Sequence, residues 1–231
     1  MTISQAQLTK PVLMVLTSYR GIVNGHEISG FYLPELTHPL DVLAQAEVPV
    51  TFASIKGGKP PVYGIGNDGI NQRYWQDGNF QQQLNHTLPL ATINSKDYSA
   101  VLFVGGHGTM WDFPDDIKVK SLIREMFESN KPVAAVCHGP AALVNVKLSN
   151  GQYLVDNKRV AAFTDTEEME VGLANVVPFL LETTLKARGA RLQTAENWQC
   201  NVVTDGVLIT GQNPQSASEV GKALCRQLLA G

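Results

Sequence analysis

Cysteine is scarce in this chain, which has only Cys137, Cys200 and Cys225 among its 231 residues. An odd and sparse set of cysteines argues against a disulfide framework. No Cys-x-x-Cys pair and no clustered His/Cys spacing indicates structural zinc, so we expect no metal and no other cofactor. A reducing cytoplasm is therefore the expected location of the protein.

The sequence also lacks a long apolar run and an excess of positive charge. No apolar segment approaches the roughly 18 residues that a membrane span requires. The first ten residues have neither the charged start nor the apolar middle of a signal peptide. The formal net charge is -3, and nothing in it favours nucleic acid or an anionic lipid surface as a partner.

Histidine is absent after position 138. Papain-like and amidotransferase triads take their base from a histidine well downstream of the cysteine, and the α/β-hydrolase order likewise places it after the nucleophile. Those arrangements are excluded here. A base for a reactive cysteine would be His138 or a histidine upstream of it.

Short β-rich runs alternate with helical patterns along the chain, which predicts an α/β three-layer sandwich with helices on both faces of a mostly parallel sheet. The early runs are almost continuously apolar, as in strands buried on both faces. The expected strands are 12–17, 48–55, 100–104, 132–136, 160–163 and 191–194, followed by a hairpin over 202–210 that turns at Asp205-Gly206. The expected helices are 33–46, 117–129, 141–147, 169–187 and 216–229.

One region departs from this alternation. Residues 56–69 are rich in glycine and proline, and residues 71–94 are rich in glutamine and asparagine. We interpret residues 56–95 as an insertion over one end of the sheet within a single domain that spans residues 1–231. It would serve as a lid or a dimer surface, or simply be a long surface excursion.

The segment Ala134-Ala-Val-Cys137-His138-Gly139-Pro140 is the most informative part of the sequence. An apolar strand stops at a cysteine, and a Gly-Pro pair and a helix-forming run follow, which is the layout of a nucleophile elbow. A thiol at a helix N-terminus beside a histidine is expected to have a lowered pKa. The alternative is a buried structural cysteine at a strand end.

Other strand ends also carry groups that suit this chemistry. Ligands bind beyond the carboxyl ends of parallel strands, so groups that follow these strands are candidates for the same site. Gly105-Gly106-His107 follows one strand, and its backbone N–H groups, with that of His138, suit an oxyanion site. His107 would line the pocket or support it from behind. One acid of the segment 165–170 is placed to orient His138, and Glu35 is placed to share a proton with the thiol. Both acids also suit a purely structural role at a helix start.

Several segments, taken in order, resemble the DJ-1/PfpI superfamily, and within it the Hsp31-like chaperone and glyoxalase III branch. They are Leu16-Thr-Ser-Tyr19, Glu35-Leu-Thr-His38-Pro39, Gly106 to Pro114, Ala134 to Pro140, Phe163-Thr-Asp165, Val177 to Glu182 and Thr210 to Ala217. The resemblance implies a flavodoxin-like, class I glutamine amidotransferase-like fold. It implies Cys137 as nucleophile, His138 as its partner, Glu168 as the third member and Glu35 at the thiol, with Gly106 and the His138 amide as the oxyanion site.

The function implied is a cofactor-independent glyoxalase of the glyoxalase III type, which converts methylglyoxal to lactate through a cysteine hemithioacetal. Alternatives from the same superfamily are a cysteine hydrolase, a protein deglycase, a holding chaperone for unfolded clients, and a redox sensor at Cys137. Phe31, Tyr32, Trp75 and Trp111 are candidates for an apolar client surface. A homodimer is expected from the resemblance.

Overall fold

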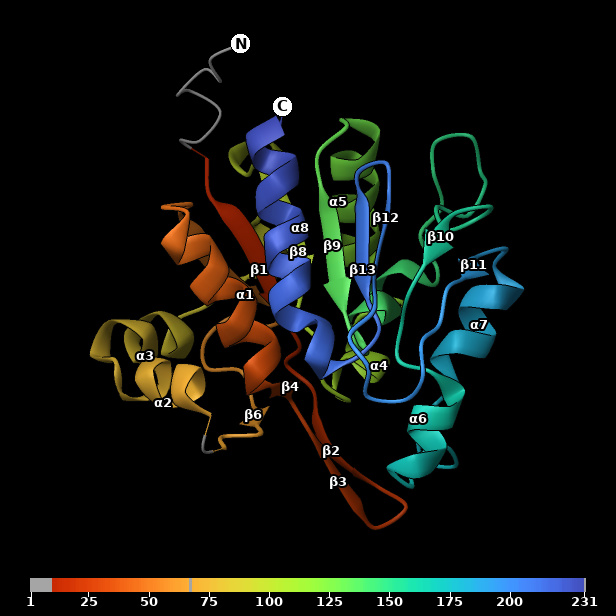
Figure 1. Ribbon diagram of the computed structural model, residues 1–231, viewed down its shortest axis with the longest axis horizontal. Coiled ribbons are helices and arrows are strands. Elements are labelled where there is room, and N and C mark those ends of the chain that lie inside the picture. The colour runs from red at the N-terminus through yellow and green to blue at the C-terminus, as the bar shows by residue number, and fades with distance from the viewer. Residues whose placement is uncertain (1–9, 67, 231) are drawn as a thin grey trace.

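The computed structural model describes residues 10–66 and 68–230, so the N-terminal stretch interpreted above as lacking a signal peptide lies outside the described residues. Its centre is a seven-stranded sheet in the order β12-β13-β9-β8-β1-β5-β7 (Figure 1). The strands, in chain order, are β1 (Val12–Leu16), β5 (Val50–Ser54), β7 (Leu88–Pro89), β8 (Ala100–Phe103), β9 (Val133–Val136), β12 (Val202–Asp205) and β13 (Leu208–Gly211). Every neighbouring pair is parallel except the β12–β13 hairpin.

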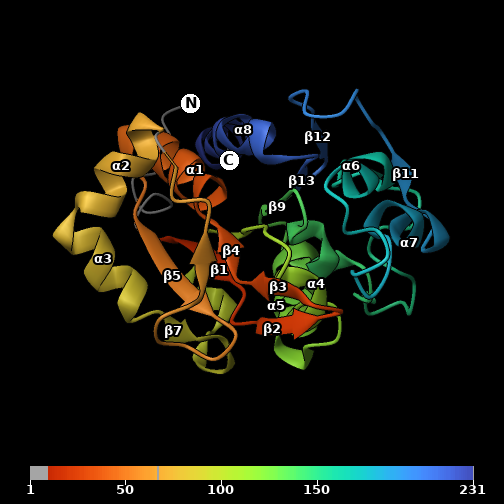
Figure 2. The ribbon, with the colours of Figure 1, turned by 90° about the horizontal axis from the view of Figure 1, so that it is seen from below.

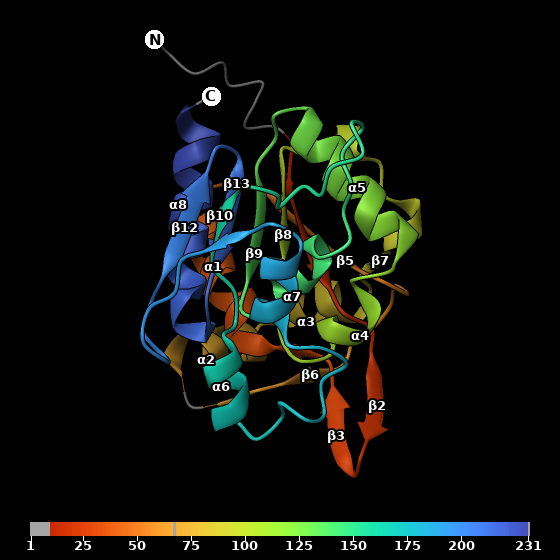
Figure 3. The ribbon, with the colours of Figure 1, turned by 90° about the vertical axis from the view of Figure 1, so that its right-hand side faces the viewer.

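Helices cover both faces of this sheet, as the alternation predicted. Helices α1 (Leu33–Gln45) and α8 (Ala217–Ala230) lie on one face and α5 (Ile117–Glu128) lies on the other (Figure 3). Four apolar residues of α5 fall at helical spacing and are buried against the sheet, namely Val119, Leu122, Ile123 and Met126, whereas Ile117 in the first turn is exposed. The mostly parallel α/β sandwich is therefore confirmed.

The region 56–95 contains more regular structure than its composition suggested. Helix α2 (Gly69–Gln76) lies beside α1 and α3 (Gly78–Asn85) lies beside α2 (Figure 2), and the two-residue strand β6 (Val62–Tyr63) pairs with β4 (Phe31–Tyr32). Each helix begins at an aspartate, Asp68 or Asp77, whose side chain accepts from backbone N–H groups of the first turn. These caps offset the weak helix preference of the glycine and asparagine residues in both helices.

Two predicted helices are wrong, for local reasons. The segment 141–147 forms only a 3-10 turn, η3 (Gly139–Leu143), because Val144, Asn145 and Val146 favour helix weakly. The span 169–187 is divided into α6 (Asp165–Glu170) and α7 (Leu181–Ala187). Gly172 has a positive φ and Pro178 follows in the connection, and both end helices.

A third difference concerns the predicted strand 160–163. Only β10 (Arg159–Val160) pairs regularly, with β11 (Arg191–Leu192). Beyond it, the Ala161 N–H donates to the Thr210 hydroxyl and the Phe163 N–H donates to the Cys137 carbonyl. This stretch therefore bonds to a side chain of β13 and to the turn that follows β9 instead of extending a ladder.

The hairpin of β2 (Arg20–Val23) and β3 (His26–Ser29) is not foreseen by the sequence patterns. It leaves the end of β1 and extends below the carboxyl edge of the sheet (Figure 1, Figure 3). The 3-10 helices η1 (Leu90–Thr92), η2 (Ser95–Asp97) and η4 (Pro214–Ser216) and the short helix α4 (Thr109–Asp112) complete the described elements. No helix in the described ranges is long and apolar enough to cross a membrane.

At Gly221, helix α8 approaches α1 closely. A Cβ at this position would lie 2.8 Å from the Pro39 Cα, a backbone atom that cannot move aside cheaply. We therefore expect Gly221→Ala to lower the free energy of unfolding by about 1–3 kcal/mol, although alanine favours helix over glycine. Urea unfolding measures the change.

The matched control is Gly78→Ala in α3, where nothing lies within 4 Å of the added Cβ. This variant should be neutral or slightly stabilised. A Gly221→Ala protein as stable as the wild type would show that the two helices are not in such close contact.

Candidate active site

The strand β9 ends in a sharp turn at Cys137, whose φ is 59°. A non-glycine residue rarely adopts this left-handed conformation, and surrounding bonds must hold it there. The Cys137 N–H donates to the Gly211 carbonyl over 2.9 Å, and its carbonyl accepts from Phe163 over 3.0 Å. The next turn packs so closely that a Cβ on Gly139 would collide with the Phe103 carbonyl. The elbow layout is thus present, although a 3-10 turn stands in place of a helix.

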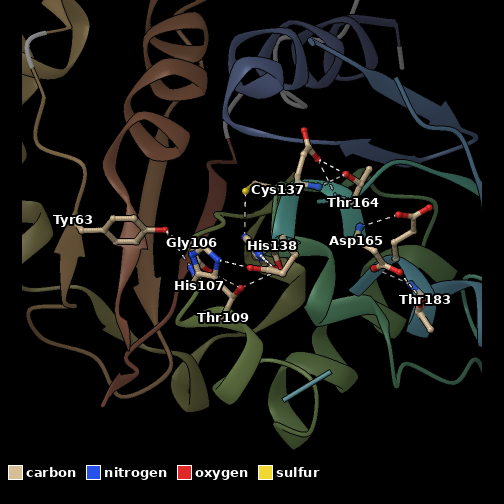
Figure 4. A network of polar contacts seen from close by, with 12 residues as sticks. Tyr63, Gly106, His107, Thr109, Cys137, His138, Thr164, Asp165 and Thr183 are labelled. Atoms are coloured by element: carbon tan, nitrogen blue, oxygen red, sulfur yellow. Dashed lines mark hydrogen bonds and ion pairs between the residues drawn. The ribbon is translucent and has the colours of Figure 1, made fainter. Parts of the chain in front are cut away.

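A chain of polar contacts begins at the cysteine (Figure 4). The Cys137 Sγ lies 3.3 Å from His138 Nδ1, and His138 Nε2 lies 2.7 Å from a Glu168 carboxylate oxygen. His138 and Glu168 are buried. Because a carboxylate only accepts, this arrangement assigns the proton of a neutral His138 to Nε2 and leaves Nδ1 free to accept from the thiol.

The series of polar contacts continues on the other side of Glu168. Its second oxygen lies 2.8 Å from His107 Nε2, and the Tyr63 hydroxyl lies 3.4 Å from His107 Nδ1. Figure 4 shows Tyr63 reaching His107 from the opposite side of the site. His107 thus supports Glu168 directly, which agrees with a role behind the thiol. Tyr63, from the region 56–95, is missed by the sequence patterns because an aromatic residue in a loop carries no specific signal.

Glu35 lies in the first turn of α1 and is fully buried against the thiol. Neither carboxyl oxygen has a well-formed hydrogen bond, although Cys137 and the backbone of Gly105 are its polar neighbours. Burial raises the pKa of Glu35 to about 8, and these two neighbours offset part of that rise. A Cβ on Gly105 would overlap the Glu35 carboxyl, so glycine is required there to make room.

The predicted lowering of the Cys137 pKa is wrong. Burial raises the pKa of the Cys137 thiol well above its ordinary value, and the Glu35 carboxylate raises it further. The His138 N–H opposes this only weakly, and there is no long helix whose N-terminus would stabilise a thiolate. The buried pair of Glu35 and Cys137 therefore avoids carrying two negative charges.

The pKa values of His138 and Glu168 are both lowered, for different reasons. Burial, with neighbouring His107, lowers the pKa of His138 to about 4, so this imidazole is neutral near pH 7. Burial alone would raise the pKa of Glu168, but His138 and His107 together lower it to about 2. The site thus pairs a neutral base beside the thiol with a permanently ionised carboxylate behind it.

Thr109 joins the two loops that border the thiol. Its hydroxyl lies 2.8 Å from the Gly106 carbonyl and 3.0 Å from the His138 carbonyl. Gly106 itself has a φ of 110°, which glycine adopts readily. The structure therefore brings together all the predicted site residues: Cys137, His138, Glu168, Glu35, Gly105, Gly106 and His107.

A cavity of about 420 Å³ adjoins this group. The β2–β3 hairpin supplies Arg20, Glu27 and Ile28 to its lining, and His107 and Tyr63 form the wall nearest the thiol. Cys137 does not line the cavity and is only 3% exposed. His107, His138 and Glu168 also bring three ligand atoms within 4.8 Å of one another, a set suited to a metal ion.

Glu167, next to Glu168, faces the opposite way and is an anchor that the sequence did not distinguish. Its first oxygen accepts from the Trp198 N–H and from the side-chain amides of Gln212 and Asn213. Its second oxygen accepts from the N–H and hydroxyl of Thr164, which forms a capping box with it. This fully buried carboxylate fixes α6, and therefore Glu168, to the C-terminal loops.

A parallel α/β sheet with a buried cysteine, histidine and glutamate at its carboxyl edge defines the class of fold and site. The DJ-1/PfpI family model matches residues 28–227, and the chain belongs to this family. It is 30% identical over 233 residues to a glutathione-independent glyoxalase of Schizosaccharomyces pombe, covering 93% of this chain and 95% of that protein.

Two solved structures are similar over nearly the whole chain. One is the Rapid Encystment Protein of Francisella tularensis, with 39% identity, a TM-score of 0.91, and coverage of 95% of this chain and 99% of that one. The other is glyoxalase III from Candida albicans, with 25% identity, a TM-score of 0.85, and coverage of 94% and 96%.

The anchoring role of Glu167 is testable by a change that keeps its shape. Glu167→Gln replaces one acceptor oxygen with an NH₂ group that faces donors, so we expect the free energy of unfolding to fall by about 3 kcal/mol. Denaturant unfolding measures this fall. Glu170→Gln, on the same helix but exposed, is the control and should change stability by under about 1 kcal/mol. Equal effects of the two variants would contradict the anchor.

Proposed function

We propose that the protein is a glutathione-independent glyoxalase of the glyoxalase III type, with methylglyoxal as substrate and Cys137 as nucleophile. The names of the similar proteins from S. pombe and C. albicans support this activity. The observation that carries the proposal is Glu35, a fully buried carboxyl without a well-formed hydrogen bond, placed against the thiol. Thiol-dependent hydrolysis has no need of such a group, whereas moving a proton between two substrate carbons does.

The first step is addition of the thiol to the aldehyde. The sulfur forms a bond to the aldehyde carbon while the thiol proton passes to Nδ1 of His138, which lies 3.3 Å from the sulfur. The carbonyl oxygen becomes an alkoxide, which the N–H groups of Gly106 and His138 would stabilise. His138 then returns the proton to this oxygen, which gives a hemithioacetal.

The second step isomerises the hemithioacetal without any external oxidant. Glu35 removes the hydrogen of the carbon bonded to sulfur as a proton, and the electron pair forms a carbon–carbon double bond while the ketone oxygen takes up the negative charge. The hydroxyl proton on the sulfur-bearing carbon passes to that oxygen, and the same carboxyl returns its proton to the neighbouring carbon, which leaves a lactoyl thioester. Water then breaks the sulfur–carbon bond, releasing lactate and restoring the thiol.

The alternative activities have less support in the described residues. A peptidase must admit a polypeptide chain to the thiol, and Cys137 is almost wholly covered. The proposed client surface also fails in part, because Phe31 is fully buried and Trp75 and Trp111 pack against the core. A deglycase activity, a redox role, chaperone clients, a cytoplasmic location and a homodimer stay predictions.

Lactate formation from methylglyoxal, without glutathione or added metal, tests the proposal. Wild type should produce lactate, Cys137→Ala should produce none, and Glu35→Gln should lower kcat about 10²- to 10⁴-fold because the proton shuttle is lost. Glu219→Gln is the matched control, since Glu219 also lies in the first turn of a helix but is exposed. Absence of lactate from the wild type, or a near-normal rate in Glu35→Gln, would contradict the mechanism.

The pH profile tests the raised pKa of Glu35. A carboxyl with a pKa of about 8 holds its proton at pH 7, so the form that accepts the substrate's proton becomes abundant only at higher pH. We therefore expect kcat/KM to rise from about pH 6 and to bend near pH 8. The bend should vanish in Glu35→Gln. A wild-type profile that is flat over this range would mean that Glu35 is already ionised.

A further inference from the structure

The two histidines near the thiol, His107 and His138, each point their Nε2 nitrogen toward the carboxylate of Glu168. His107 Nε2 and His138 Nε2 lie 2.8 and 2.7 Å from the two oxygens of Glu168, and the two rings are 4.1 Å apart between centroids. Two imidazole nitrogens and one carboxylate oxygen form the donor set of zinc sites that keep a fourth position open. No function assigned above uses the three groups in this way.

We propose that His107, His138 and Glu168 form a binding site for Zn²⁺, and that an ion there switches off the thiol chemistry. The three ligand atoms already lie within 4.8 Å of one another. Zinc bonds of about 2.0–2.2 Å in tetrahedral geometry need ligand atoms roughly 3.3 Å apart. The contact between the coordinating Glu168 oxygen and its own histidine would thus open by about half an ångström, and ligand atoms now as much as 4.8 Å apart would close by up to about 1.5 Å, to admit the ion.

The ion has a route to this site that does not pass the thiol. The His107 side chain is 15% exposed and lines the cavity of about 420 Å³ formed with the β2–β3 hairpin. A water molecule from this cavity would occupy the fourth position. His138 and Glu168 are nearly inaccessible, so the ion would contact His107 first.

Proton balance links occupancy of the site to inhibition. A neutral imidazole carries one proton, and the contacts with Glu168 place it on Nε2 of each histidine. When zinc takes Nε2 of His138, that proton moves to Nδ1 and faces the Cys137 sulfur, so Nδ1 no longer accepts the thiol proton. The corresponding proton of His107 moves to its own Nδ1, beside the Tyr63 hydroxyl.

Cysteine is not a ligand in this arrangement. The thiol lies at Nδ1 of His138, on the opposite side of the ring from the nitrogen that faces Glu168. Loss of the thiol should therefore leave zinc binding intact. This separates the proposed site from a cysteine–histidine zinc site, in which the sulfur would bind the ion.

Isothermal titration with Zn²⁺ alone tests the proposal on the full, reduced chain. A Cys200→Ser background removes an exposed thiol that would compete for the ion. We expect one equivalent of zinc to bind, with a Kd that Cys137→Ala changes by less than about threefold. His107→Gln and Glu168→Gln should each weaken binding by more than the roughly 10- to 100-fold typical of losing an outer partner. His38→Gln is the matched control, because His38 pairs with Asp68 outside the site.

A spectroscopic measurement protects the test against variants that fail to fold. Co²⁺ bound to the unmodified site should show the visible absorption of a four-coordinate ion without a thiolate-to-cobalt charge-transfer band. Absence of saturable zinc binding, or binding that needs Cys137 but not His107, would overturn the proposal.

Only the inhibitory consequence rests on the proposed function. Lactate formation without zinc binding would refute this site alone, and zinc binding without lactate formation would refute the glyoxalase alone.

Discussion

The left-handed backbone at Cys137 is the constraint on which the rest of the site depends. Such a conformation costs a non-glycine residue about 1–3 kcal/mol, so it persists only because Gly211 and Phe163 bond to the same residue on both sides. The turn ends β9 at the carboxyl edge of the sheet and places His138 beside the thiol, where Glu168 reaches it. Without the bend, Cys137 would continue the strand as an ordinary core residue.

A second constraint follows from the burial of the thiol beside Glu35. Two acidic groups in a dry site share protons instead of ionising together, and both of their pKa values are raised. This is why the expectation of an activated thiolate was wrong: it considered the helix terminus and the histidine but not the cost of desolvation. The groups are suited to moving protons in a site from which water is largely excluded.

Much of the fold could be predicted from periodicity alone, because buried parallel strands and amphipathic helices have distinct patterns. The elbow was also visible, since a cysteine between an apolar strand and Gly-Pro is an unusual combination. The contribution of Tyr63 was not visible, because it depends on the pairing of the short strands β4 and β6, which the sequence patterns do not predict. The span 169–187 was predicted as one helix because its apolar residues outweighed Gly172 and Pro178 in that interpretation.

The adjacent residues Glu167 and Glu168 in α6 have different roles, which can be distinguished only in the three-dimensional structure. Glu168 faces the histidines, while Glu167 is held by Trp198, Gln212 and Asn213, which belong to loops on the far side of the helix. Substitutions in those loops would therefore tilt the carboxylate behind His138 without touching the reacting groups. Natural variation should therefore be restricted at Gln212 and Asn213, whose side chains make two of these bonds, and an engineer who grafts this site must transplant the loops together with α6.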